Sequence, residues 1–553
     1  MQDELHQLLQ AHECLRDKET LSNGTIRYSL LIPPLPEERS IEDAWIEIPK
    51  DFPDPSTARI KLPEKYILKI PHVESGGHLC IDGDPGPLSG GSPCERINQL
   101  IDSFYMSFIE PWSRGELDDH FITEAMNYWG VYCARYLSEH QPIFKIYTTN
   151  PRPKSPKVYK SIFLEHRRIV IAGENSSLRT RYIHSLSSGA KQANIITAEI
   201  PIAFPFTPEN WPKTLADIQR ITSARLSSAD SNLFFNSMGR RERKIHRIVI
   251  FKASGSSFGY LLPGGPPTII HRHRSIKSYP SNSLLPLEVE RLDVSWTTGR
   301  DQHPEYQSRQ KKHVLVIGAG ALGSPTIEQL AKSGVGRLSI IDGETLDTSN
   351  IGRHVLGADS IGKSKAKEVA ESVSIRWASC DAKGLNTTIQ VWLETHQLKE
   401  ADLILDLTGE PEVHDLIDKE RKKHSVDLVI AWMEPYVAAA HTCILPTGSP
   451  WKIGDCDKLK SLNSVDWPDE VMMNEPACSS RFQSYTPTAA THAVALTAEA
   501  ALDLLDQKVH APIVRHWVRG QQYLDKCHPG LQLRQWAQQA TEFDGIVLQQ
   551  NYE

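Results

Sequence analysis

The chain has 553 residues, of which 40% are hydrophobic and 23% charged, and its formal net charge is −7. This length predicts two to four domains, and the composition excludes a fibrous or a largely disordered protein. The mildly acidic balance gives no electrostatic support for direct contact with nucleic acid or with an anionic membrane. No basic and apolar leader and no apolar run of about eighteen residues occurs, so a cytoplasmic location is expected.

The nine cysteines are an odd number, are widely scattered and include no C-x-x-C pair. This pattern supports neither a disulfide framework nor a cysteine-rich zinc site. Most of the thiols are therefore expected to be small buried hydrophobic groups, and a minority to be nucleophiles.

The pattern of apolar residues divides the chain into three parts. Residues 1–146 combine extended and helical periodicity in an α+β unit. The proline-rich stretch 147–157 reads as an exposed linker, and residues 147–305 form a β-rich or mixed linker domain of unknown fold. Residues 306–553 begin with a strand, a glycine turn and a helix. The predicted fold class is therefore multidomain α/β and α+β.

The glycine turn of the last domain has the form G-x-G-x-x-G. Gly318, Gly320 and Gly323 follow an apolar strand and open an amphipathic helix, and this is the context in which such a turn binds phosphate. Asp342 ends the next strand, 24 residues after Gly318, and is suited to holding ribose hydroxyls. These residues alone fit any Rossmann-type nucleotide site, including one for NAD.

A set of polar and basic side chains then favours ATP. Asn350, Arg353, Lys363 and Lys365 follow Asp342 within a short segment. Hydride transfer does not need such a cluster. Attack of a carboxylate on the α-phosphate of ATP does need it, because negative charge builds on the phosphates and is held by cations and Mg²⁺. ATP and Mg²⁺ are the predicted cofactors.

The order of these motifs resembles the ThiF/MoeB family and the ubiquitin-activating enzymes, with a Rossmann-type adenylation domain. The resemblance implies that Asp342 binds ribose, that Asn350 and Arg353 bind phosphates, and that Lys365 holds transition-state charge. Lys363 is an adjacent alternative to Lys365.

The metal ligand is left open by the sequence. In the family, the loop after the third strand offers an aspartate toward Mg²⁺, and Gly409 takes that place here. Asp406 or Glu410 is the alternative, and Asp406 is also counted among the nucleotide-binding residues. The absence of the C-x-x-C pairs of some relatives weighs weakly against the molybdopterin-type branch.

Cys478 is the first predicted nucleophile. It lies in a polar loop near Arg481 and before an alanine-rich helix, and this placement resembles the thioester cysteine in the crossover loop of activating enzymes. An ordinary loop cysteine is the alternative. Cys456 is the reserve candidate, and Cys443, in an apolar run, is predicted to be core.

Cys80 is the second predicted nucleophile. Residues 1–140 are similar to the ubiquitin-conjugating fold, whose acceptor thiol lies in a loop after a proline-rich strand segment. The usual His-Pro-Asn triplet is absent, and the segment at His72 reads His-Val-Glu instead. The group that steadies the oxyanion is therefore open, with His78 as an alternative, and a structural role for Cys80 also remains open.

The domain order resembles bacterial fusion enzymes of ubiquitin-like conjugation that are encoded with cyclic-oligonucleotide antiphage (CBASS) systems. The resemblance implies an enzyme that adenylates a protein C-terminus, passes the acyl group from Cys478 to Cys80, and transfers it to a lysine amine of a target. It also implies a cyclic-oligonucleotide-synthesising nucleotidyltransferase as the activated partner, and a homodimer.

Three alternatives remain from the sequence. The first is a sulfur-carrier adenylyltransferase with a non-catalytic N-terminal binding domain, and the second is a non-enzymatic scaffold. An NAD-dependent dehydrogenase is the third. Nucleotide preference and pyrophosphate release separate these classes.

Overall fold

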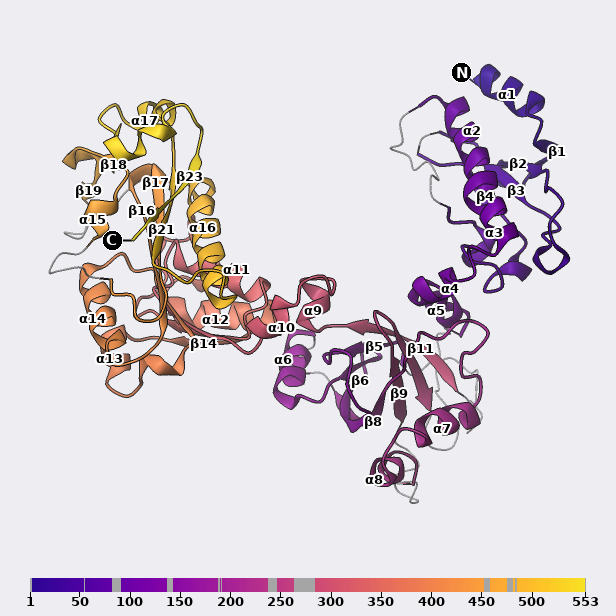
Figure 1. Ribbon diagram of the computed structural model, residues 1–553, viewed down its shortest axis with the longest axis horizontal. Helices are drawn as coiled ribbons and strands as arrows, with labels where there is room; N and C mark the ends of the chain where they lie inside the picture. Colours follow the sequence, from indigo (N-terminus) through magenta and orange to yellow (C-terminus); the bar gives the residue numbers. More distant parts are fainter. Residues whose placement is uncertain are drawn as a thin grey trace. The chain divides into compact units, whose positions relative to one another are not determined.

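The chain divides into two compact units in the computed structural model (Figure 1). The first unit contains Met1–Glu174 and Ala190–Glu290, and the second contains Asn175–Gly189 and Arg291–Glu553. The division into three domains stays a prediction. No described helix is both long and apolar enough to cross a membrane. The structure describes residues 2–53, 55–81, 91–136, 143–186, 189, 191–236, 246–262, 284–451, 458–474, 481–482 and 485–552.

The N-terminal part is an α+β arrangement around a four-stranded antiparallel sheet of order β1-β2-β3-β4. Alternate residues of the strands face a core, as Ile46 and Ile48 do, and the helices supply the opposite side of that core. The strands are β1 (Leu15–Thr20), β2 (Ile26–Leu30), β3 (Trp45–Ile48) and β4 (Arg59–Lys61). The helices are α1 (Gln2–Ala11), α2 (Pro93–Ser103), α3 (Glu110–Arg114), α4 (His120–Thr123) and α5 (Ala125–Tyr136).

The start of α2 is fixed by its own sequence. The Ser92 hydroxyl accepts a hydrogen bond from the Glu95 backbone N–H, the Glu95 carboxylate accepts one from the Ser92 N–H, and Pro93 occupies the first turn. Ile97, Leu100 and Ile101 then recur at helical spacing and are buried against the sheet.

The segment predicted to be β-rich or mixed is a closed barrel of seven strands, with the order β10-β11-β5-β7-β6-β8-β9. Helix α5 packs against it, because the Trp129 indole donates a hydrogen bond to the Leu287 carbonyl at 3.0 Å. The strands are β5 (Lys145–Thr148), β6 (Lys157–Leu164), β7 (Ile169–Ala172), β8 (Gln192–Pro201), β9 (Arg247–Lys252), β10 (Ser257–Leu262) and β11 (Leu285–Arg291), and helices α7 (Leu215–Ser223) and α8 (Ser228–Ser231) lie between β8 and β9.

The prediction of an exposed linker at residues 147–157 is wrong at both ends. Tyr147 belongs to β5 and Lys157 begins β6, while Thr148 and Thr149 are buried. The prolines occupy the short loop that joins these two barrel strands, where a missing N–H removes no ladder hydrogen bond. Proline content alone therefore does not separate a strand connection from a linker between domains.

The second unit is built on an eight-stranded sheet of order β14-β13-β12-β15-β16-β17-β21-β23, with a hydrophobic core on each face. The first five strands run parallel and the last three are antiparallel. The strands are β12 (His313–Ile317), β13 (Arg337–Ile341), β14 (Asp381–Leu385), β15 (Leu403–Asp406), β16 (Asp427–Met433), β17 (Ala439–Leu445), β21 (Ile513–Val518) and β23 (Ile546–Asn551).

The remaining elements of this unit are helices and short strand pairs. The helices are α6 (Ser176–Leu186), α9 (Val294–Thr297), α10 (Glu305–Arg309), α11 (Gly323–Lys332), α12 (Lys365–Arg376), α13 (Ile389–Leu393), α14 (Pro411–Arg421), α15 (Leu459–Leu462), α16 (Pro487–Leu505) and α17 (Gln521–Cys527). The strand pairs are β18 (Val465–Asp466) with β22 (Gln532–Leu533), and β19 (Met473–Asn474) with β20 (Arg481–Phe482).

The strand order defines where a ligand is expected. From β12 the chain passes to β13 and β14 on one side of the sheet and then returns to β15 on the other side. Ligands of open parallel sheets bind at the carboxyl ends of the strands, at such a reversal of order. The glycine turn follows β12 directly and therefore lies at this point.

A largely buried chain of hydrogen bonds connects the residue after β16 with β17, β21 and β23. The Gln550 amide donates to His516 Nε2, so the His516 Nδ1–H donates to His441 Nδ1 at 2.6 Å. His441 then carries its proton on Nε2 and donates it to Glu434, also at 2.6 Å. Glu434 further accepts the Ser464 N–H, which anchors the segment that follows α15. Both imidazoles are neutral in this arrangement.

We expect this network to make the second unit sensitive to acid. Burial, and then His441, lowers the pKa of His516 to about 2 from an ordinary value of 6.5. The unfolded chain takes up this proton as the pH falls through 6.5 and the folded chain does not, so the free energy of unfolding decreases by about 1.4 kcal/mol per pH unit below that point. The measurement is hydrogen exchange of β17 and β21 between about pH 5 and pH 7, corrected for intrinsic rates.

The control for this experiment is His516→Gln, which has no group titrating near pH 6.5. Its opening free energy is expected to depend less on pH than that of the wild type, by about 1.4 kcal/mol per unit. Equal slopes in the two proteins would contradict the assignment.

Candidate functional site

The glycine turn is held by backbone contacts that side chains would prevent. Gly318 has a φ of 90°, which favours glycine, and its N–H donates to the Ile341 carbonyl at 2.9 Å. A Cβ at Gly323 would lie 2.0 Å from the Gly318 carbonyl oxygen, so only glycine lets α11 begin this close to the turn. A Cβ at Gly320 meets nothing within 4 Å. The space beside Gly320 is therefore open at the N-terminus of a helix, where the backbone favours anions.

Asp342 joins the second strand to this turn. Its carboxylate accepts the Ala319 N–H at 2.7 Å and the Glu344 N–H at 2.8 Å. The side chain predicted to bind ribose thus lies directly against the glycine turn. Its role in binding ribose stays a prediction.

The segment predicted to bind phosphate is fastened to the same turn by a histidine. The Leu356 N–H donates to His354 Nδ1, so the ring proton is on Nε2 and is donated to the Ala319 carbonyl at 2.6 Å. Burial lowers the pKa of His354, which keeps the ring neutral in this role. Asn350 orders the start of the segment, because its side-chain oxygen accepts the Asp347 N–H at 3.1 Å.

Sequence reasoning did not identify His354 as part of the site. The available signal was its position next to Arg353 in the N-x-x-R motif.

Arg353 lies over the ring of Tyr485, with its guanidinium carbon 5.8 Å from the ring centroid. Burial raises the pKa of the Tyr485 hydroxyl, which therefore stays protonated. Tyr485 follows Cys478 by seven residues in the sequence. The cation–π contact therefore links the segment predicted to bind phosphate to the chain just before α16.

The two predicted lysines differ in burial and in partner. Lys365 is buried at the start of α12, and its ammonium group pairs with Glu344 Oε2 at 2.5 Å, although 74% of the Glu344 side chain is exposed. Lys363 is exposed and pairs with Glu368 at 3.2 Å. An exposed carboxylate is a weak partner that solvent screens, so Lys365 can exchange it for a phosphate at modest cost.

Asp406 is completely buried at the end of β15. Its Oδ1 accepts hydrogen bonds from the Thr408 N–H and hydroxyl, and its Oδ2 lies 3.7 Å from His414 Nε2. Burial raises its pKa. A Cβ at Gly409 meets nothing within 4 Å, so the position where the family has an aspartate faces open space. Nucleotide or metal binding by Asp406 stays a prediction, as does the Glu410 alternative.

The cysteine predictions have different outcomes. Cys443 is buried in the sheet, and burial raises its pKa, as expected of a core thiol. Cys478 and Cys456 lie outside the described residues. Cys80 is exposed, as a nucleophile requires.

Cys80 lies opposite His72 in a short antiparallel turn. The bridge between Val73 and Leu79 sets this register, and the Cys80 N–H donates to the His72 carbonyl at 2.9 Å. His72 has a φ of 65°, a strained conformation for a residue with a side chain. Among the described residues, the His78 Nδ1 atom has no hydrogen-bond partner, and burial lowers the pKa of that ring.

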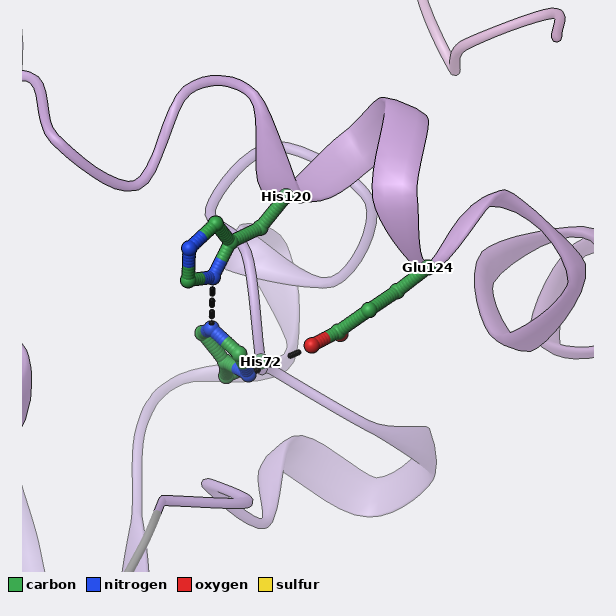
Figure 2. Close-up of side chains that lie close together, drawn as sticks. All are labelled: His72, His120 and Glu124. Atoms are coloured by element: carbon green, nitrogen blue, oxygen red, sulfur yellow. Dashed lines mark hydrogen bonds and ion pairs between the residues drawn. The ribbon is translucent and has the colours of Figure 1, made fainter.

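A cluster of polar side chains surrounds the His72 ring (Figure 2). His72 Nε2 lies 2.7 Å from His120 Nδ1, and His72 Nδ1 lies 3.7 Å from the Glu124 carboxylate. The Tyr128 hydroxyl donates to Glu124 at 3.0 Å and accepts the His72 backbone N–H at 3.0 Å. Burial, and then the neighbouring charges of Glu124 and Cys80, raise the pKa of Tyr128. Sequence reasoning missed His120, Glu124 and Tyr128.

The spacing within this cluster is that of a hydrogen bond. Two histidine nitrogens on one tetrahedral zinc ion lie about 3.3 Å apart. The 2.7 Å between His72 Nε2 and His120 Nδ1 is shorter and matches a shared proton. His72 and His120 are therefore described as a hydrogen-bonded pair.

Comparisons with known proteins agree with the fold of the second unit. Residues 299–509 match the model of the ThiF family. The ATP-dependent ubiquitin transferase-like protein Cap2 of Pseudomonas aeruginosa is 21% identical over 359 residues, 62% of this chain and 64% of that protein. The Cap2 of Enterobacter hormaechei is 25% identical over 46% of this chain and 47% of that protein. The probable adenylyltransferase/sulfurtransferase MoeZ of Mycobacterium tuberculosis is 39% identical over 113 residues, 18% of this chain and 26% of that protein.

These matches confirm the predicted fold class, because a ThiF-type α/β domain forms the C-terminal part of a mixed multidomain chain. The similarity to the Cap2 proteins also confirms the predicted resemblance to bacterial fusion enzymes with a ubiquitin-activating-like domain. In each case the matched segment spans less than two thirds of the relative's length.

Two glycine variants are expected to separate the nucleotide role of the turn from its folding role. Gly320→Ala places a methyl group in open space, so stability should change by less than about 0.5 kcal/mol, while ATP affinity falls at least tenfold because the methyl occupies phosphate space. Gly323→Ala places its methyl group against the Gly318 carbonyl and should destabilise α11 by about 1–3 kcal/mol.

Calorimetric titration with ATP and hydrogen exchange of α11 measure the two effects. A Gly320→Ala protein that binds ATP like the wild type would show that phosphate does not enter at this turn.

Proposed function

We propose that the chain activates the C-terminal carboxylate of a protein by adenylation with ATP and Mg²⁺. This proposal is supported by the groups that gather at the carboxyl end of β12. The backbone at Gly320 is open, and the Asp342 carboxylate lies against the glycine turn. Arg353 and Lys365 lie on segments that hydrogen bonds attach to the turn or to the chain just after Asp342. An anion-binding helix start with added cations stabilises charge that develops on an α-phosphate under attack.

The reaction that fits these groups is displacement at the α-phosphate. A carboxylate oxygen bonds to the α-phosphorus, the bond to the bridging oxygen breaks, and pyrophosphate leaves. Arg353 and Lys365 hold the charge of the phosphate oxygens during this step. Asp406 or Glu410 would hold Mg²⁺, and the bound ion would supply positive charge to the pyrophosphate leaving group.

Two thiols extend the proposal to conjugation. Cys478 attacks the acyl-adenylate and releases AMP, Cys80 takes the acyl group by transthiolation, and a lysine amine of a target receives it. Each thioester keeps the acyl group activated, so no second ATP is consumed. The exposure of Cys80 supports its part in this sequence.

The proposed partner is a cyclic-oligonucleotide-synthesising nucleotidyltransferase of an antiphage system, activated at its own C-terminus. Similarity to two Cap2 proteins, named as ubiquitin transferase-like, supports transfer of a protein. A homodimer and a cytoplasmic location complete the proposal.

Pyrophosphate exchange tests the adenylation step. Exchange of labelled pyrophosphate into ATP should require a candidate partner with a free C-terminal carboxylate. Arg353→Ala and Lys365→Ala should each lower the exchange rate by about 100-fold, because each removes a charge that is needed mainly in the transition state.

The matched controls are Arg376→Ala and Lys367→Ala, which remove exposed charges from α12 and should leave exchange within about twofold. Equal losses in the test and control variants would contradict the assigned roles.

A second candidate function is activation of a sulfur carrier, which the similarity to MoeZ favours. It requires adenylation but no acyl transfer to Cys80. Intact-mass measurement after incubation with ATP and partner separates the two functions, because conjugation predicts thiol-sensitive adducts on the chain. Cys80→Ala should retain an adduct and lose transfer to amines, and Cys478→Ala should lose both.

Cys527→Ala is the matched control, since Cys527 is half-buried at the end of α17 and has no proposed role. Transfer to amines at the wild-type rate by both Cys80→Ala and Cys478→Ala would overturn the relay of thioesters.

A further inference from the structure

Transfer of an acyl group from Cys80 to an amine requires the removal of protons from that amine, and the thiol does not do this alone. A lysine amine is protonated at neutral pH, and it must lose two protons in total to become an amide nitrogen. The first is lost to solvent before attack, and the second leaves the nitrogen as the carbon–nitrogen bond forms. A base within hydrogen-bond reach of that nitrogen accelerates the step. The inference rests on the conjugating role proposed for Cys80.

Three elements bring the cluster together. His72 comes from the turn opposite Cys80, His120 begins α4, Glu124 ends the same helical turn, and Tyr128 lies on α5. His120 and Glu124 are four residues apart and therefore share a helix face. Two hydrogen bonds hold the backbone of His72 in its strained conformation. Its N–H donates to the Tyr128 hydroxyl, and its carbonyl accepts the Cys80 N–H.

The directions of the hydrogen bonds in the cluster leave one ring nitrogen of His120 able to accept a proton. His72 Nδ1 lies 3.7 Å from the Glu124 carboxylate, which is beyond hydrogen-bond distance but close enough to favour the ring proton on that nitrogen. With the proton on Nδ1, Nε2 accepts from His120 Nδ1–H. His120 Nε2 is then the basic atom, and Figure 2 shows it pointing away from both His72 and Glu124. Tyr128 fixes the carboxylate by donating to it.

We propose that His120 takes the proton from the amine that attacks the Cys80 thioester, with His72 and Glu124 as positioning residues. The amine nitrogen bonds to the thioester carbon, and a proton passes from this nitrogen to His120 Nε2. The carbon–sulfur bond then breaks, and its electron pair leaves as the Cys80 thiolate. The resulting imidazolium donates to His72 Nε2, and the Glu124 carboxylate offsets its charge. The proton later passes to the thiolate or to water.

The charged and titratable groups around the pair are consistent with this direction. The turn contributes Cys80, α4 contributes Glu124, and α5 contributes Tyr128. Asp119 precedes His120 at the start of α4. Two of these groups are carboxylates, so a positive charge on the histidine pair is favoured where it forms.

The test begins with direct loading of Cys80 in the full-length protein, which makes it independent of ATP. A short glycine-ended peptide, supplied as its mercaptoethanesulfonate thioester, exchanges onto Cys80, and peptide mapping by mass spectrometry quantifies the adduct. Cys80→Ala gives the background. Discharge of the loaded chain is then timed with lysine and, separately, with dithiothreitol, whose attacking thiolate sulfur carries no proton to be removed.

His120→Gln is the central variant, because its amide can still donate to His72 but cannot take up a proton. Its discharge to lysine should be slower by about 100-fold or more, while discharge to dithiothreitol stays within about twofold. Glu124→Gln keeps an acceptor for Tyr128 and should slow lysine discharge by about tenfold. His12→Gln is the matched control, since the His12 ring accepts the Cys14 N–H near the end of α1 and has no proposed role.

Several results would overturn the inference. Equal slowing with both nucleophiles would assign His120 a structural role, and unchanged lysine discharge would remove it from the reaction. Loss of wild-type discharge on chelation, restored by zinc, would make the cluster a metal site. A wild-type chain that loads Cys80 but never transfers to lysine would remove the conjugating role itself.

Discussion

The nucleotide half of the chain depends on one close contact between two backbone segments. A side chain at Gly323 would overlap the Gly318 carbonyl oxygen, so the two glycines alone allow α11 to begin directly above the end of β12. That contact exposes backbone N–H groups at the one point where the order of the parallel strands reverses. Asp342 and His354 then bond to Ala319 within the turn, which gathers around it the segments predicted to bind ribose and phosphate.

The two proposed reactions place opposite demands on the protein. Displacement at a phosphate builds negative charge, and the chain offers Arg353 and Lys365, whose charge is fixed and whose partners are exchangeable. Aminolysis of a thioester releases a proton, and the chain offers a hydrogen-bonded histidine pair beside the Glu124 carboxylate. The second unit therefore offers positive charge for the proposed reaction at phosphate, and the first unit offers a proton acceptor for the proposed reaction at the thioester.

The sequence predicted what is local along the chain. The glycine turn, Asp342 and the basic segment after it follow one another within fifty residues, and each residue type has a chemical reason: open backbone and cations for phosphate, a carboxylate for ribose hydroxyls. The burial of Cys443 was also predictable, because its neighbours form a continuous apolar run. The roles of the predicted site residues in binding and catalysis remain predictions.

What the sequence did not predict depends on contacts between distant segments. His120, Glu124 and Tyr128 lie about fifty residues from His72, and no spacing rule marks a histidine that faces another histidine across a domain. The seven-stranded barrel was seen only as β-rich, because short strands carry no signal of their pairing order. The prolines of the loop between β5 and β6 made that loop look like a linker between domains, because proline is common in both.

The central claim is that a carboxylate attacks the α-phosphate of ATP, and the fate of its oxygen atoms tests this directly. A partner C-terminus labelled with ¹⁸O at both carboxylate oxygens should give AMP that carries one ¹⁸O after the acyl group moves to sulfur. Unlabelled AMP, or ADP and phosphate as the products, would contradict the account.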